Sequence, residues 1–313
     1  MLTTHPLLAG RQPFVQLMVL LLLIISSALL TFFVGIIVAI PIYGTDILNT
    51  LINASDLSTE RDIAMMKYFQ VVNQLGVFII PSLLFSFLVS RNIVDYLCLN
   101  REPARISVII TIILIFAILP IIHWFVEINE GLHLPDFLSR IEEWMKASEE
   151  SAMKLTEAFL STTSISGLIF NIIMIGFLAA VGEELLFRSV LIRLFNNWFN
   201  NVHVAVIVSS LLFSAFHLQF FGFIPRFFLG LLFGYLFVWS GSVWLPILAH
   251  FMNNASAVVV YYLVNIGYLH TDADAFGATE NILLLLLSFI ISGVFMAMIF
   301  FVEKKKRSIP IKI

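Results

Sequence analysis

The sequence predicts an all-α fold, a polytopic membrane bundle of about eight transmembrane helices. Of its 313 residues, 60% are hydrophobic and only 12% are charged. Soluble globular domains carry about 25% charged residues, so the composition excludes an ordinary soluble protein. The hydrophobic residues also gather in stretches close to the length of about 20 residues that a membrane-crossing helix requires.

Eight stretches have the length and hydrophobicity expected of membrane spans. The first is longer than the apolar region of a signal peptide, which covers about 7–15 residues, and we expect it to be retained. The fifth and sixth are short, and a hairpin that enters the bilayer without crossing it is an alternative for them. The eight spans are expected near residues 14–40, 68–89, 106–126, 167–187, 203–218, 226–240, 246–264 and 281–302.

The distribution of charge between the loops predicts how the chain is oriented. An even number of spans places both termini on one side, and that side holds 11 of the 17 Lys and Arg residues. The opposite loops, 41–67, 127–166, 219–226 and 265–280, hold 15 of the 20 Asp and Glu residues. Because cytoplasmic loops are enriched in Lys and Arg, we expect a multi-pass cell-membrane protein with both termini in the cytoplasm.

Loop 127–166 is the one long connection between the expected spans. Its apolar and acidic residues alternate at roughly helical spacing. The pattern indicates either an amphipathic helix lying on the membrane surface or an ordinary solvated helix. Both interpretations place a helix on the acidic side.

Three ionisable residues lie within six positions of one another in the apolar stretch 167–198: Glu183, Glu184 and Arg188. A charged side chain near the bilayer centre costs about 2.5–3.5 kcal/mol, so such residues usually have a function. Glu184 and Arg188 are spaced i, i+4, which predicts an ion pair on one helix face. A purely structural ion pair is an equally good interpretation of these two residues. Glu183 points about 100° away and has no basic partner along the helix, which suits a general base.

Two histidines and an asparagine lie in other expected spans: His217, His250 and Asn254. His250 and Asn254 are spaced i, i+4 and therefore share a helix face. Glu183 and His217 are each 17 positions from Asn200, the centre of the turn between the fourth and fifth helices. In an antiparallel hairpin, residues equidistant from the turn lie at the same height. We therefore expect these two side chains to meet, in the cytoplasmic half of the bilayer.

Three motifs in this order resemble the CPBP family, the CAAX protease and bacteriocin-processing family also called Abi. They are Glu-Glu-x-x-x-Arg at 183–188, Phe-x-x-x-His at 213–217 and His-x-x-x-Asn at 250–254. Each motif alone is weak, but three in order on separate apolar segments are a strong joint signal. On this basis the chain is expected to comprise N-terminal helices and an outer loop (1–164), a catalytic core (165–265) and a last helix with a basic tail (266–313).

The resemblance implies an intramembrane endopeptidase of the CAAX-protease type. Glu183 and His217 would activate water, His250 and Asn254 would stabilise the oxyanion, and Glu184 and Arg188 would orient them. Family members are often labelled metalloproteases, and a mechanism without metal has also been argued for them. If a divalent metal such as zinc is present, its ligands would be Glu183, His217 and His250. The expected partners are the lipid bilayer and a peptide or lipidated protein substrate, with no nucleic acid.

Two other functions compete with the protease interpretation. Intramembrane Glu and His residues also form proton relays in transporters, although no internal repeat is visible in the sequence. A non-catalytic membrane protein that confers self-immunity to a bacteriocin is the second alternative. Other intramembrane proteases fit less well, because the sequence has no HExxH, no GxSxG and no Asp within an expected span.

Overall fold

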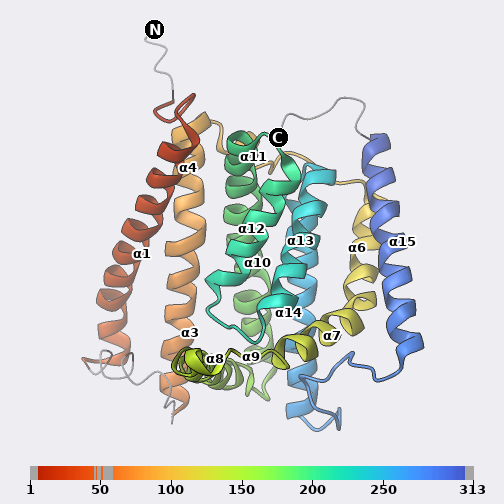
Figure 1. Cartoon of the computed structure of the whole chain (residues 1–313). Helices are drawn as coiled ribbons and strands as arrows, with labels where there is room; N and C mark the ends of the chain where they lie inside the picture. The colour runs from red at the N-terminus through yellow and green to blue at the C-terminus, as the bar shows by residue number, and fades with distance from the viewer. Residues whose placement is uncertain (1–5, 46, 48–50, 52–58, 307–313) are drawn as a thin grey trace.

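The computed structural model describes residues 6–45, 47, 51 and 59–306, and every regular element within them is a helix (Figure 1). The predicted fold class, an all-α polytopic bundle, is therefore confirmed. Residues 1–5 and 307–313 and part of loop 41–67 lie outside the described residues. Among them are Arg307 and Lys312, which were counted in the basic tail.

Most helices run along one common direction, with short breaks between them (Figure 1). In chain order they are α1 (Pro13–Tyr43), α3 (Glu60–Gln74), η1 (Leu75–Ile79), α4 (Ile80–Ser90), α5 (Ile93–Tyr96), α6 (Arg105–Ala117), α7 (Leu119–Glu130), η2 (Asp136–Leu138), α8 (Ser139–Leu160), α9 (Ile165–Asn171), η3 (Ile172–Leu178), α10 (Ala179–Glu184), η4 (Leu185–Ile192), α11 (Arg193–Phe199), α12 (Val202–Phe216), α13 (Phe223–Ser240), α14 (Trp244–Asn265) and α15 (Ile282–Lys306).

Each of the eight expected spans coincides with helix, but not all are long enough to cross a bilayer alone. In the described residues six helical runs are long and apolar enough: Pro13–Tyr43, Glu60–Ser90, Ile165–Phe199, Phe223–Ser240, Trp244–Asn265 and Ile282–Lys306. A seventh is the pair α6 and α7, bent by 43°. The fifth expected span is α12, whose 15 residues make it a shorter apolar helix. By length, six or seven of the eight expected spans could cross a bilayer.

A proline explains the bend between α6 and α7. Pro120 lies in the first turn of α7, directly after the break at Ile118. Proline lacks the backbone N–H that would continue the helix, and its ring crowds the preceding turn. As a result α7 turns toward the end of the bundle where α8 lies (Figure 1).

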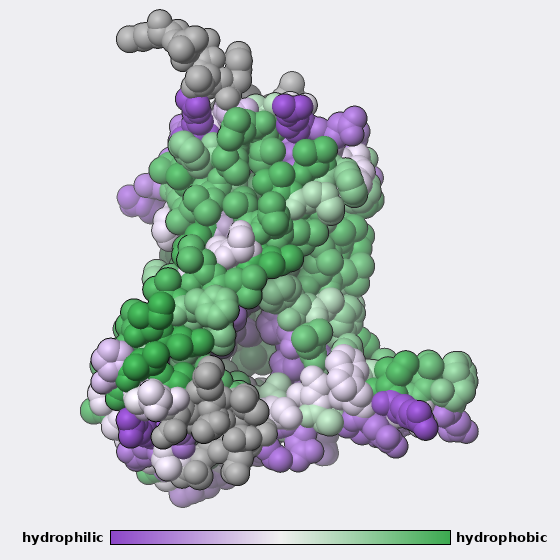
Figure 2. Space-filling model, turned by 90° about the vertical axis from the view of Figure 1, so that its left-hand side faces the viewer, coloured by the Kyte–Doolittle hydropathy of each residue, from purple (hydrophilic) through white to green (hydrophobic). Residues whose placement is uncertain are grey.

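Helix α8 crosses the base of the bundle instead of joining it. It is seen end-on in Figure 1, and in Figure 2 the base of the molecule is hydrophobic above and hydrophilic below. Ile141, Trp144 and Met153 are exposed large apolar side chains of this helix. These features favour the surface-lying amphipathic helix over a fully solvated one. At its start Lys146 and His133 bind Glu142 and lower the pKa of its carboxyl to about 2.

The two faces of the molecule differ in charge as the sequence predicts. α1 begins and α15 ends at the same face, where the turn at Asn200 also lies, and α8 lies at the opposite face (Figure 1). The first face carries Lys304–Lys306, and α8 carries most of the acidic residues of its loop. Arg188 does not belong to the first face, because its side chain is only 1% exposed and lies in the core. Which face is cytoplasmic remains a prediction.

Close helix packing builds the core beside the motif residues. The main cluster joins apolar residues of α1, η1 and α4 to those of α10, η4, α12 and α13. Gly230 and Gly234 of α13 form the contact with α12. A Cβ at Gly230 would lie 2.9 Å from Cβ of Ser210, and one at Gly234 would lie 2.8 Å from Val206. The GxxxG step therefore serves close packing.

Three π-helical segments interrupt two long helical runs: η1 lies in Glu60–Ser90, and η3 and η4 lie in Ile165–Phe199. A π turn bonds residue i to i+5 and leaves one backbone carbonyl without its usual partner. In each segment a side chain from a neighbouring helix donates to a carbonyl. Ser27 donates to Gly76, Asn254 to Ile175 at 3.0 Å, and Ser209 to Phe187 at 2.7 Å. The bonds from Asn254 and Ser209 fix α14 and α12 to the run that carries the two glutamates.

Candidate active site

Glu183 and Glu184 end α10, a six-residue helix between the π segments η3 and η4. Both side chains are buried, with 6% of Glu183 and none of Glu184 exposed. Irregular π turns are frequent at functional sites, because they reorient the side chains on either side of them. The two carboxylates therefore lie within the bundle and face different neighbours.

Glu184 connects a cation to a histidine. Its Oε2 lies 2.9 Å from Nε of Arg188, which confirms the predicted i, i+4 ion pair. Its Oε1 lies 2.8 Å from Nδ1 of His250 on α14. Because a carboxylate only accepts hydrogen bonds, Nδ1 of His250 carries the proton that is donated here. The Arg188–Glu184–His250 chain thus fixes the orientation of the His250 ring.

Aromatic rings surround the buried guanidinium and both histidines. The guanidinium carbon of Arg188 lies 4.4 Å from the ring centre of Phe213 and 5.4 Å from that of Phe233. Phe213 also contacts the rings of His217 and His250, and Phe233 stacks on His250 with ring centres 5.1 Å apart. Phe213, a residue of the second motif, therefore packs against all three cationic or titratable groups.

Glu183 lies opposite two imidazoles without touching either. Its Oε2 is 4.0 Å from Nε2 of His217 and 4.0 Å from Nε2 of His250. This oxygen is buried and has no hydrogen-bond partner in the described residues. The other oxygen, Oε1, accepts a hydrogen bond of 3.4 Å from the Gln74 side chain. The gap in front of Oε2 is the central feature of the site.

His217 is placed by the end of α12. It is the C-terminal cap of this helix, and its Nδ1 lies 2.8 Å from the carbonyl oxygen of Phe213. A carbonyl accepts, so Nδ1 donates and the neutral ring presents the lone pair of Nε2 toward Glu183. The side chain is 29% exposed, more than either glutamate. The expectation that Glu183 and His217 face each other across the hairpin at Asn200 agrees with this arrangement.

Asn254 has a partner that the sequence did not indicate. Its amide donates to the carbonyl oxygen of Ile175 in η3, and its Oδ1 accepts from Asn253 at 3.1 Å. Asn254 therefore holds α14 against the helix that carries the glutamates. One of its two amide hydrogens remains for another acceptor.

Gln74 and Phe233 are site residues that sequence reasoning missed. Gln74 lies 109 positions from Glu183 and is only 3% exposed. Gly182 permits the contact, because a Cβ there would lie 3.3 Å from Gln74 Oε1. A buried glutamine in an apolar span is a signal that could have been used. Phe233 carries no such signal among 31 phenylalanines.

The end of α12 determines where His217 lies relative to the two faces of the molecule. His217 caps the end of α12 that is remote from Asn200, so about 17 residues of helix, or about 25 Å, separate it from the basic face. The loop 218–222 that follows contacts α8: Ser148 donates to the Leu218 carbonyl and Phe221 N–H donates to Glu149. His217 therefore lies nearer the α8 face than the face of the termini. The sequence placed the site in the cytoplasmic half from the start of α14 and from Arg188, and this placement stays a prediction because the orientation of the chain is untested.

Part of the chain is similar to a known protein family. Residues 165–256 match the family described as Type II CAAX prenyl endopeptidase Rce1-like. All residues that the three motifs contribute lie within this region, and the resemblance to the CPBP family is confirmed. Together with the apolar helices, this match supports an integral membrane protein that contains a region similar to a membrane endopeptidase family. No curated protein and no solved structure matches the chain.

Proposed function

We propose that this chain is an intramembrane endopeptidase of the CAAX-protease type, which hydrolyses a peptide bond of a membrane-associated peptide or lipidated protein. The unpartnered Oε2 of Glu183, with two imidazole nitrogens at 4.0 Å, supports this proposal most strongly. A water oxygen about 2.8 Å from each atom of such a pair would bridge the gap. The site therefore suits a water molecule held between a base and two imidazoles.

The reaction begins with removal of a proton from this water by the Glu183 carboxylate. The hydroxide attacks the scissile carbonyl carbon, a C–O bond forms, and the carbonyl electrons move to oxygen as an oxyanion. The oxyanion then collapses and the C–N bond breaks. The proton held by Glu183 passes to the leaving nitrogen, which departs as a neutral amine. His217 orients the water through Nε2 in the first step.

His250 stabilises the oxyanion in this scheme. Its Nδ1 is committed to Glu184, so Nε2 can donate only when the ring is protonated. The second amide hydrogen of Asn254 adds a further donor to the oxyanion.

The same residues fit zinc less well than water. Glu183, His217 and His250 are suitable ligand types, but two ligands about 2.1 Å from a tetrahedral zinc are about 3.4 Å apart. Both nitrogens lie 4.0 Å from Glu183 Oε2, and no group of three His, Cys, Asp or Glu residues in the described chain is placed to hold a metal. No step is derived through a metal. Added chelator is expected to leave turnover unchanged.

The decisive test compares the wild type with Glu183→Gln in detergent, using a prenylated CAAX reporter and measuring peptide release with and without chelator. Loss of the general base should lower turnover by about 10²–10⁴-fold while the thermal unfolding midpoint stays close to that of the wild type. Glu303→Gln is the matched control, because Glu303 is equally buried and accepts from Ala104 far from the site. Glu303→Gln should retain turnover.

Two results would contradict the proposal. Equal cleavage by wild type and Glu183→Gln would remove Glu183 from the chemistry. Protection of cells against a bacteriocin by both proteins, without cleavage by either, would favour the immunity function. Strong inhibition by chelator would show that a metal belongs in the site.

A further inference from the structure

A second feature of the molecule lies between the site and the α8 face. It is a cavity of about 420 Å³ bordered by α7, α8, the loop 219–222 and the start of α13, with Tyr261 and Asp274 closing one side. Asn129 of α7 fixes this loop by donating to the Phe220 carbonyl and accepting from Ile224 N–H. The loop, which follows His217 in the chain, thus forms the inner side of the cavity.

The inner wall of the cavity adjoins the catalytic groups. Gln219 follows His217 by two residues, and Arg226 lies within electrostatic range of both His217 and Glu183. The Arg226 guanidinium donates to the backbone and side-chain oxygens of Gln219. Gly222 leaves room for it, since a Cβ there would lie 2.5 Å from Nη1.

The outer part of the cavity is lined by four carboxylates: Glu130, Glu149, Glu157 and Asp274. Glu149 accepts from Phe221 N–H, and Asp274 accepts from the Tyr261 hydroxyl. Glu130 and Glu157 are exposed and make no hydrogen bond or ion pair with a described residue. The one guanidinium of the lining, that of Arg226, offsets the charge of only one of these four carboxylates. The field at the opening is therefore negative, and it attracts a positive ligand.

We propose that this cavity is the entrance through which a positively charged peptide segment reaches Glu183, from the face opposite the basic helix ends. The proposal rests on the proposed protease function and names the substrate class of the same site. The scissile bond lies at the inner end, beside His217. Lys or Arg residues flanking that bond face Glu130 and Glu157.

Peptide charge provides the first test. Two peptides share one scissile sequence and are flanked by Lys or by Glu residues. Glu130→Gln combined with Glu157→Gln should lower kcat/KM for the Lys peptide at low salt, by about fivefold for each ion pair lost between a peptide Lys and one of these two glutamates. The kcat/KM for a neutral peptide should stay unchanged. Glu127→Gln combined with Glu143→Gln is the matched control, because it removes the same charge from α7 and α8 outside the cavity. Equal loss in both double variants overturns the proposal.

Binding separates this proposal from the protease function. Fluorescence anisotropy measures the Lys peptide on Glu183→Gln protein, which needs no turnover. Binding that weakens with salt and in the Glu130/Glu157 double variant supports the entrance even if no peptide is cleaved. Cleavage by the wild type with no preference between the Lys and Glu peptides overturns the entrance and leaves the protease function intact.

Blocking the cavity tests the route itself. Cys98 is the single native cysteine and is buried, so a Cys98→Ser background permits selective labelling. A bulky, membrane-impermeant maleimide on Thr156→Cys, which lines the cavity, should abolish cleavage. The same label on Glu143→Cys should not.

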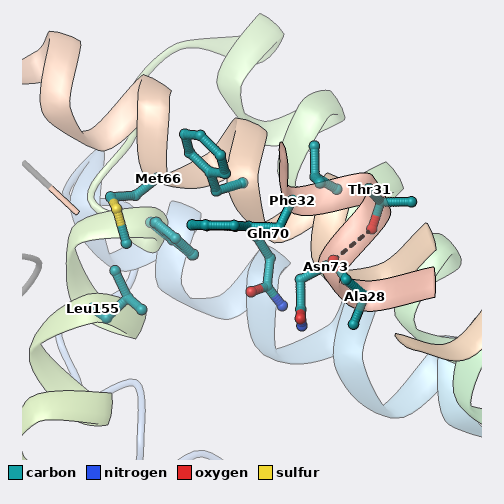
Figure 3. Close-up of a pocket in the computed structure, with 10 residues that line it drawn as sticks. Ala28, Thr31, Phe32, Met66, Gln70, Asn73 and Leu155 are labelled. Carbon is teal, nitrogen blue, oxygen red and sulfur yellow. Dashed lines mark hydrogen bonds between the residues drawn. The ribbon is translucent and has the colours of Figure 1, made fainter. Parts of the chain in front are cut away.

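A second cavity offers a competing route. It has about 230 Å³ between α1, α3 and α8, and Figure 3 shows the amides of Gln70 and Asn73 lying side by side in it. Figure 2 shows a hollow on this side of the molecule, just above its base. Labelling of Asn73→Cys should leave cleavage intact. Loss of cleavage only on Asn73→Cys labelling would overturn the proposal in favour of this lateral route.

Discussion

Glu184 binds two partners, Arg188 and His250, and the sequence predicted only the contact with Arg188. The contact with Arg188 is local, four positions along one helix, and it follows from helical geometry. The contact with His250 spans 66 positions and depends on how α14 packs. The same holds for Gln74 and Glu183. Sequence spacing therefore predicts pairs on one helix, and hairpin symmetry adds His217, while partners from distant helices need the folded bundle.

Two variants can separate a positioning role for Arg188 from a purely structural one. Arg188→Met leaves Glu184 buried without its cation, which should cost about 3–5 kcal/mol of stability and lower the thermal unfolding midpoint in detergent. The double variant Glu184→Gln, Arg188→Met removes both charges, and most of the stability should return. Turnover should not return, because His250 has lost the carboxylate that orients it. Recovery of both stability and turnover would show that the Glu184–Arg188 pair has only a structural role.

The elements around the site depend on small residues at helix contacts. α12 is too short to be fixed by the bilayer alone, and α13 packs against it through Gly230. Arg188 Nη2 also lies 3.5 Å from the Gly230 carbonyl, so this contact joins the packing to the ion pair. A shift of α13 would move Phe233 and with it the His250 ring.

Gly230→Ala tests this contact. The added methyl would lie 2.9 Å from the Ser210 Cβ, so α12 and α13 must separate, at a cost of about 1–3 kcal/mol. Thermal unfolding should show the loss, and turnover should fall with it. Gly293→Ala in α15 is the matched control, because nothing lies within 4 Å of a Cβ there. It should be neutral or stabilise by up to about 1 kcal/mol. An equal effect of both substitutions would contradict the packing interpretation.

Hydrophobic length predicted the positions of all eight helical segments, but not their internal breaks. The π segments η3 and η4 lie inside one continuous helical run, Ile165–Phe199, and their widened turns depend on side chains such as Ser209 from other helices. The bend before Pro120 follows a residue type that the sequence does show. The π segments, which tertiary contacts stabilise, therefore left no signal in the sequence. The bend, which the covalent geometry of proline causes, has a signal in the sequence.

At the scale of the whole molecule, the cavity and the charge distribution give opposite expectations about the substrate. The similarity to CAAX prenyl endopeptidases favours a substrate that enters the site from the cytoplasm. The basic face, which the positive-inside rule assigns to the cytoplasm, is the one remote from His217 and from the acidic cavity. The hairpin argument gave the relative height of Glu183 and His217, but it could not measure their depth from either surface, because the lengths and tilts of the helices differ.

Reporter fusions decide the orientation independently of catalysis. The C-terminal basic cluster predicts that green fluorescent protein fused after Ile313 is fluorescent and that alkaline phosphatase at the same position is inactive. Alkaline phosphatase inserted in the loop 266–281 should be active, because α15 returns the chain to the basic face. Replacing Lys304, Lys305 and Lys306 with Gln should weaken this bias without altering the site. The opposite pattern of reporter activity would place the acidic cavity in the cytoplasm, where a cytosolic prenylated protein could reach Glu183 directly.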